Sequence, residues 1–184
     1  LGHMFIVAAT SYLCTLEMDI DACPKRFYNN FYAGLFHDLP EVLTKDIISP
    51  VKGSVEGLKE IIKDYEDFQM KEELLPLLPR PWHGDMKYFS ESEFENKIND
   101  KQEVKLGVSF RDLNKKYNQD EYSPLDGELL HAADRLAAFI EAKLSLNHGI
   151  KSVELEEAAD NIYSDYMGCK ISGVDFGRIF NYFR

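Results

Sequence analysis

The chain has few cysteines and no long apolar run, and both absences limit the kind of protein it can be. Its three cysteines are scattered at Cys14, Cys23 and Cys169 and form no CxxC pair. This pattern is typical of a reduced, cytoplasmic protein and not of a disulfide scaffold. No apolar segment approaches the ~20 residues that cross a membrane, and no signal-peptide pattern is visible. We therefore expect a cytoplasmic protein without a membrane partner.

Positive charge is also scarce. The chain has 21 Lys and Arg residues against 32 Asp and Glu residues, which gives a formal net charge of −11. Such a surface repels nucleic-acid backbones and anionic membranes, so we expect neither as a partner. A small phosphorylated substrate stays open, because a bound divalent cation reverses the local field. The ordinary alternative is that the acidity only keeps the protein soluble.

Length and apolar content predict one domain with a sizeable core. The 184 residues are 45% hydrophobic and 12% aromatic. Apolar residues recur at helical spacing through most of the chain, which predicts an all-α fold, a helical bundle. We expect helices over residues 3–17, 24–38, 54–70, 127–147 and 154–167, and a last one in VDFGRIFNYF.

The segment over residues 79–124 differs, because it is charged and is interrupted by proline and glycine. We predict that it is a mostly irregular excursion over the surface of one domain, whose core comprises residues 3–78 and 125–184. Two short helices are expected inside it, with Ser90–Glu93 and Ser109–Asp112 as their capping boxes. The stretch VKLGVSF is expected to form a short hairpin strand.

The stretch LFHDLPEVLTKDIISPVK places His37, Asp38, Glu41 and Asp46 in an otherwise apolar segment. Burying an unpaired carboxylate is costly, and a divalent metal ion is a strong partner for one. A mixed set of imidazole nitrogen and carboxylate oxygen suits Mn, Fe, Co, Ni or Zn better than Ca. For an isolated His-Asp pair, the ordinary alternative is a surface helix cap.

A second carboxylate, Asp134, lies in the middle of the predicted helix HAADRLAAFIEA, among four alanines. Small neighbours allow another helix to approach closely, and a carboxylate on such a face needs a partner. That partner is either a metal ion or a cation such as Arg135 or Arg178 in a structural ion pair, and both remain open at this point.

His3 completes the order His, then His-Asp, then a distant Asp on an alanine-rich helix. This order resembles the H…HD…D motif of the HD-domain superfamily of metal-dependent phosphohydrolases. HDLPEVLTKDIISPVK is similar to HDxxEVLTGDxxxPVK, the signature of the bacterial and archaeal 5′-deoxynucleotidase-like branch. The resemblance extends from residue 3 to about 147, and its most specific part runs from His37 to Lys52.

The resemblance implies an all-α fold, a homodimer and one divalent metal ion: Mn, Co, Fe, Ni or Zn, with Mg also allowed. The implied metal ligands are His3, His37, Asp38 and Asp134.

The resemblance also assigns the substrate-side residues. Glu41 matches the glutamate that orients and activates the attacking water, and Asp46 matches the aspartate that contacts the sugar hydroxyl. Thr44 and Lys52 occupy matching motif positions, and we expect them to contact the substrate. The chemistry agrees, because a metal lowers the pKa of its bound water and a nearby carboxylate can accept the proton.

The chain departs from the family pattern at the residue that binds the substrate phosphate. The family carries an Arg, often beside a Trp, on a helix that precedes the first His, and this chain begins after that point. We expect a native segment before Leu1 to carry it; otherwise the phosphate site is built differently, with Lys45 or Lys52 as stand-ins. Lys45 also replaces a frequent family glycine, so the loop geometry is expected to differ.

We therefore predict a metal-dependent hydrolase of nucleoside 5′-monophosphates, with deoxyribonucleotides as the expected substrates. The alternative is an HD module that binds metal but is catalytically impaired and has a regulatory or assembly role. A third hypothesis keeps the fold but changes the substrate to a cyclic dinucleotide or a guanosine polyphosphate. The cyclic-dinucleotide branch with HDxGK is disfavoured, because positions 41 and 42 are Glu and Val.

Overall fold

The computed structural model describes residues 1–44 and 58–184 of the chain. Its chain divides into two compact units: the first comprises Leu1–Leu35 and Ser92–Arg184, and the second Phe36–Glu91. Helices dominate both units, which confirms the predicted all-α fold. The organisation as a single domain stays a prediction.

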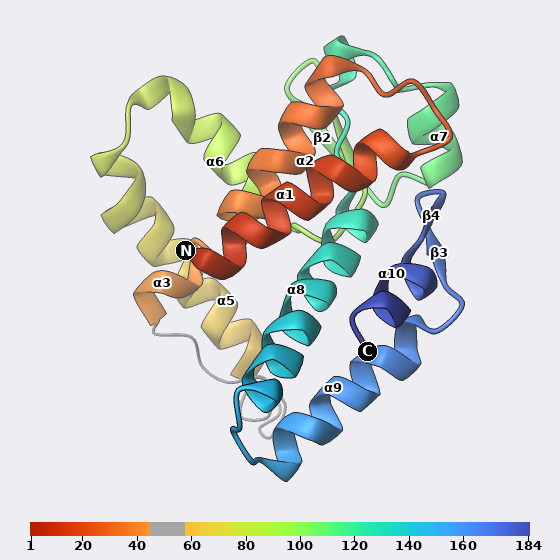
Figure 1. Cartoon of the computed structure of the whole chain (residues 1–184). Coiled ribbons are helices and arrows are strands. Elements are labelled where there is room, and N and C mark those ends of the chain that lie inside the picture. Colours follow the sequence, from red (N-terminus) through yellow and green to blue (C-terminus); the bar gives the residue numbers. More distant parts are fainter. Residues whose placement is uncertain (45–57) are drawn as a thin grey trace. The chain divides into compact units, whose positions relative to one another are not determined.

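Five helices form most of the first unit (Figure 1). Helix α1 packs along α8, α9 runs back along α8, and α10 packs on α9. The helices predicted from apolar spacing are confirmed here, with ends that differ by at most two residues. Their bounds are α1 (Gly2–Glu17), α2 (Pro24–Phe36), α8 (Gly127–Asn147), α9 (Val153–Tyr166) and α10 (Phe176–Tyr182).

Aromatic side chains from the end of the chain fill the core of the first unit. Phe176 and Phe180 of α10 are fully buried, as is Phe139 of α8. The rings of Phe180 and Tyr166 stack with their centroids 4.8 Å apart. A short hairpin of two two-residue strands, β3 (Lys170–Ile171) and β4 (Val174–Asp175), leads directly into α10. The expectation that the C-terminal segment is a helix that docks aromatics is thus confirmed.

Helices α1 and α2 approach each other so closely that one position must be glycine. A Cβ atom on Gly34 would lie 2.7 Å from the Cα of Ala8, closer than real Cβ atoms approach backbone. Beside this crossing, the Asn30 amide donates to the Thr15 hydroxyl at 2.9 Å. A larger residue at position 34 would force the two helices apart.

A buried ion pair joins α2 to the start of α8. The guanidinium of Arg26 donates twice to the carboxylate of Asp126, through Nε at 2.6 Å and through a terminal nitrogen at 2.5 Å. Both side chains are completely buried. Asn30 makes two further hydrogen bonds with Asp126. The side-chain amide of Asn30 donates to the Asp126 carboxylate, and the side-chain oxygen of Asn30 accepts from the Asp126 backbone N–H. Such two-pronged, charge-assisted contacts fix the direction of both elements.

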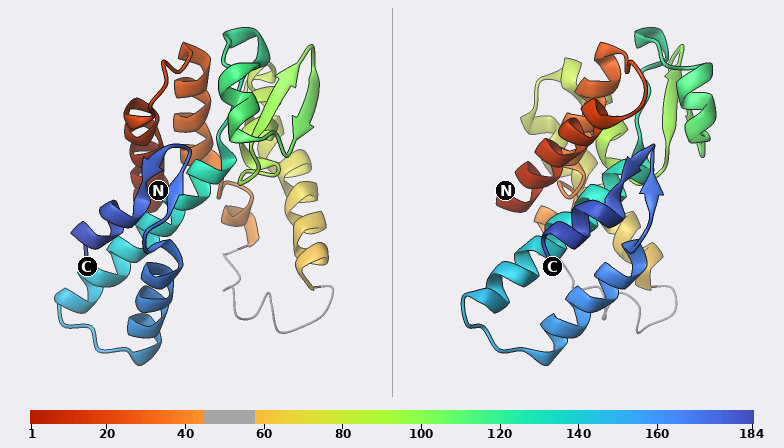
Figure 2. Two further views of the ribbon diagram at one scale, coloured as in Figure 1. Left: turned by 90° about the vertical axis from the view of Figure 1, so that its right-hand side faces the viewer. Right: turned by 45° about the vertical axis from the view of Figure 1, so that its right-hand side comes forward.

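Residues 92–125 carry a hairpin and short helices: β1 (Lys97–Asp100), β2 (Glu103–Leu106), α7 (Phe110–Lys115) and η4 (Asp120–Tyr122). Strands β1 and β2 pair antiparallel, next to α7 (Figure 2). The hairpin predicted for VKLGVSF and the cap at Ser109 are confirmed, since the Ser109 hydroxyl accepts from the Asp112 N–H at 3.1 Å.

The predicted cap at Ser90 is wrong. Ser90 is the last residue of α6 (His83–Ser90), and its hydroxyl donates back to the Met86 carbonyl at 2.9 Å. A serine that bonds to the carbonyl four residues earlier sits inside a helix and cannot start the next one. The chain then reverses at Ser92, which has a φ of 46°.

The segment that we predicted to be an excursion over the surface also contributes to the interior. Ile98 and Leu113 have no exposed area. Asn118 accepts a hydrogen bond from the Cys23 N–H at 3.0 Å, and Asp120 accepts one from the Lys25 N–H at 2.8 Å. This segment therefore holds the start of α2 in place.

The second unit is built from short helices, and α3 packs on α5. The helix predicted over residues 54–70 is present from Leu58 onward, while its expected cap, Ser54, lies outside the described residues. Ile62 is buried on α5, whereas Ile61 and Tyr65 are exposed. The bounds of the elements not yet given are α3 (Glu41–Thr44), α5 (Leu58–Gln69), a π-helical turn η1 (Met70–Leu74), η2 (Leu75–Leu77) and η3 (Arg80–Trp82).

Within residues 1–44 and 58–184, no helix combines the length and the apolar character that a membrane crossing requires.

We expect Arg26→Ala to lower the free energy of unfolding by ~3–5 kcal/mol, because it leaves the Asp126 carboxylate buried without its cation. Urea denaturation followed by circular dichroism measures this loss. The control is Lys116→Ala, which removes an exposed ion pair with Asp112 and should cost less than ~1 kcal/mol. Similar losses in the two variants would contradict a stabilising role for the buried pair.

We expect Cys14 to resist alkylation in the native protein. Burial, helped by the charge of Glu17, raises the pKa of its thiol to about 12, so almost no thiolate exists at pH 8. Mass spectrometry after iodoacetamide treatment should find Cys14 modified only once urea has unfolded the chain. Modification of native Cys14 as fast as that of Cys169 would show that the helix packing around it is wrong.

Candidate metal centre

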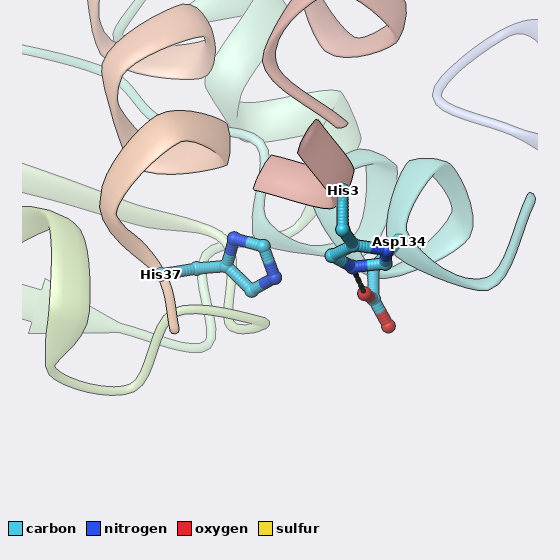
Figure 3. A group of neighbouring side chains, drawn as sticks. All are labelled: His3, His37 and Asp134. Atoms are coloured by element: carbon cyan, nitrogen blue, oxygen red, sulfur yellow. Dashed lines mark hydrogen bonds and ion pairs between the residues drawn. The ribbon is translucent and has the colours of Figure 1, made fainter. Parts of the chain in front are cut away.

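His3 and Asp134 lie side by side although 131 positions separate them in the sequence. His3 is in the first turn of α1 and Asp134 is in the second turn of α8. The Nε2 atom of His3 is 2.9 Å from Oδ1 of Asp134, and the hydrogen bond is drawn as a dashed line in Figure 3. The two side chains are 26% and 21% exposed, so both remain accessible.

Small residues on both helices explain why these side chains meet. Ala132, Ala133 and Ala137 of α8 are buried, as are Val7 and Ala8 of α1. Without long side chains between them the helices pack closely. The alanines around Asp134 thus allow α1 to pack closely against α8.

A third ionisable side chain, Glu141, lies on the far side of the His3 ring. Its Oε1 atom is 3.4 Å from Nδ1 of His3, and its side chain is 47% exposed. Glu141 lies seven residues after Asp134, two turns further along the same face of α8. The sequence did not single out Glu141: its spacing of seven from Asp134 places both residues on one face of α8 but does not show that α1 packs there.

In the second unit, His37 and Asp38 form another pair of donors. They occupy the turn that follows α2, and Nε2 of His37 is 3.1 Å from Oδ1 of Asp38. The His37 side chain, also drawn in Figure 3, is 1% exposed, and that of Asp38 is 38% exposed. Neighbouring residues on a regular helix point about 100° apart, so the end of α2 at Phe36 is what lets these two converge.

Glu41 begins α3, directly after Pro40. Its backbone N–H donates to the carbonyl of Asp38 at 3.1 Å, so a tight turn, and not a continuous helix, connects it to the His-Asp pair. Thr44 ends α3, and its side chain is outside what the structure describes. Asp46 and Lys52 lie outside the described residues.

The two donor pairs suit a divalent transition metal. Each pair offers one imidazole nitrogen and one carboxylate oxygen, the mixed set that Mn, Fe, Co, Ni or Zn accepts. Donor atoms about 3 Å apart can bind the same ion at the ~2.0–2.2 Å that such bonds need. The separations of 2.9 Å for His3 with Asp134 and 3.1 Å for His37 with Asp38 meet that requirement.

His131 lies one turn before Asp134 on α8. Its ring packs on Phe94 with the centroids 4.7 Å apart. Partial burial lowers the pKa of His131 below its ordinary value, and the charge of Asp134 acts in the opposite direction. Burial therefore favours the neutral form of the His131 imidazole.

The fold is helical, and a His–Asp pair joins two of its helices, α1 and α8, that are far apart in the sequence. The family model described as "HD domain" matches residues 1–163, and the chain therefore belongs to the HD-domain family. HD domains bind divalent metals and are generally hydrolases. Neither the curated proteins nor the solved structures contain a match to the chain.

In the metal-free protein, we expect His131 to titrate with a pKa below 6.5. Because the folded state depresses this pKa, the stability that His131 contributes is present above pH 6.5 and is lost as the pH falls through the folded value. NMR titration of the ring protons, assigned with His131→Gln, measures the midpoint. In Phe94→Ala, which exposes the ring, the midpoint should rise toward 6.5; a midpoint above 6.5 in the unaltered protein would contradict this account.

Proposed function

We propose that this protein hydrolyses nucleoside 5′-monophosphates, with deoxyribonucleotides preferred, at one divalent metal ion. The observation that carries the proposal is the His3–Asp134 pair, which joins α1 and α8 in a chain of the HD-domain family. The similarity of HDLPEVLTKDIISPVK to the 5′-deoxynucleotidase-like signature supports the choice of substrate.

In this proposal the ion is held by the four side chains that the H…HD…D motif implies. His3 and Asp134 supply the first pair, and His37 and Asp38 supply the second. The two nitrogens and two carboxylate oxygens leave coordination positions for water and for a phosphate oxygen. A bound divalent ion would supply a water of lowered pKa and would polarise the phosphate. Such an ion also makes the local field at the site favourable for a phosphate, although the chain as a whole carries a net charge of −11.

Glu41 takes the proton of the attacking water in this proposal. Glu41 follows the His-Asp pair after a tight turn at Pro40, and its backbone N–H donates to the Asp38 carbonyl. This bond ties the backbone of the proposed base to that of a proposed ligand, so that their relative position is restricted. We propose further that Asp46 binds the sugar hydroxyl, and that Thr44 and Lys52 contact the substrate.

We also propose a homodimer and a cytoplasmic location. Exposed apolar side chains on one face of α1 support an interface between copies, since Phe5, Leu13 and Leu16 are each more than half exposed. Such residues are costly to leave in water and are typical of interface cores.

The test is phosphate release from deoxyribo- and ribonucleoside 5′-monophosphates. Metal-stripped protein is resupplied with Mn²⁺, Co²⁺, Mg²⁺ or Zn²⁺, and bound metal is counted in each sample. We expect Glu41→Gln to lower kcat by ~10²–10⁴-fold, the usual worth of a general base, and to keep one ion per chain. Asp38→Asn should lose metal as well as activity, and the exposed Glu157→Gln on α9 should match the unaltered protein.

The outcomes separate the alternatives. One bound ion without turnover of any nucleotide would contradict the hydrolase and favour a metal-binding module with a regulatory or assembly role. Turnover restricted to a cyclic dinucleotide or a guanosine polyphosphate, included in the panel, would contradict the choice of substrate but not the chemistry.

A further inference from the structure

We propose that Glu141 is a positioning residue for the metal centre. In this inference, which rests on the proposed function, Glu141 accepts a hydrogen bond from Nδ1–H of His3. It thereby fixes the ring as the tautomer whose bare Nε2 faces Asp134 and the metal. Glu141 does not itself touch the ion.

The ring of His3 is placed between two carboxylates from the same helix. Nε2 is 2.9 Å from Oδ1 of Asp134, and Nδ1 is 3.4 Å from Oε1 of Glu141. All three residues belong to the first unit, and α1 packs directly on α8. One ring nitrogen therefore faces a proposed ligand, Asp134, while the opposite nitrogen faces the carboxylate of Glu141.

This arrangement resolves a conflict that Asp134 alone would create. A carboxylate beside Nε2 favours a proton on that nitrogen, and a protonated nitrogen cannot bind metal. A second carboxylate beside Nδ1 stabilises the proton on the other side of the ring. Metal-binding histidines in general donate their second N–H to a carboxylate or carbonyl, which orients the ring and raises its basicity.

The exposure of Glu141 separates this role from a structural one. Its side chain is 47% exposed, and exposed ion pairs contribute little to folding because water and salt screen them. The loss of Glu141 should thus change metal affinity much more than the stability of the metal-free protein.

The experiment compares Glu141→Ala and Glu141→Gln in the full chain, with Glu157→Ala on α9 as a matched exposed control. Zn²⁺ affinity is measured by competition with a chelator, and Tm is measured on the metal-free protein. We expect Glu141→Ala to weaken Zn²⁺ binding by ~10–100-fold, the range for such partners. Glu141→Gln should lose less, because its amide oxygen still accepts a hydrogen bond. Glu157→Ala should change neither quantity, and the Tm of all three variants should match that of the unaltered protein.

A spectroscopic measurement reports on the tautomer itself. In the Zn²⁺-loaded protein, long-range ¹H–¹⁵N correlation should show the His3 proton on Nδ1, with faster solvent exchange of that proton in Glu141→Ala.

Unchanged Zn²⁺ affinity in Glu141→Ala would overturn the inference and leave the proposed function intact. Weakened affinity that comes only with a lowered Tm of the metal-free protein would also overturn it, since Glu141 would then be structural. If His3→Ala binds Zn²⁺ as tightly as the unaltered protein, His3 is no ligand, and the proposed ligand set fails together with the inference.

Discussion

The buried ion pair between Arg26 and Asp126 is the contact on which the rest of the first unit depends. It fixes α2 against the start of α8, while Asn30 bonds to Asp126 and, through Thr15, to α1. Three helices are therefore held by one network of fully buried polar groups. Removing either charge would leave the other without a partner in a low-dielectric interior, which is far more costly than losing an exposed pair.

Because this network fixes the positions of α1 and α8, it also affects the candidate metal centre. Asp134 follows Asp126 by two turns on α8, and His3 is carried by α1, so the network that sets the helices also sets the His3–Asp134 contact at 2.9 Å. The alanines between the helices let the two backbones approach, and Glu141 reaches the His3 ring from the same face of α8. A site built on packed helices holds its side chains more rigidly than one built on loops.

Much of the first unit's helical structure, and part of the candidate metal centre, could be predicted from the sequence. Apolar spacing located the helices of the first unit, and the order of His and Asp residues singled out His3 and Asp134, which the fold brings into contact. Arg26 and Asp126 could not be recognised, because nothing in a helix that starts at Pro24 marks one arginine as buried. The cap assigned to Ser90 failed because a Ser-x-x-Glu pattern also fits the end of a helix, where the serine bonds backward. Glu141 was missed because its importance depends on the packing of α1 against α8, which spacing along one helix does not show.

The most direct test of the central claim is the position of the metal. Crystals grown with Mn²⁺ and measured at the manganese absorption edge would locate the ion by its anomalous signal. The account predicts one ion per chain, bound by His3, His37, Asp38 and Asp134. An ion held elsewhere, two ions at this place, or no ion beside His3 and Asp134 would contradict it.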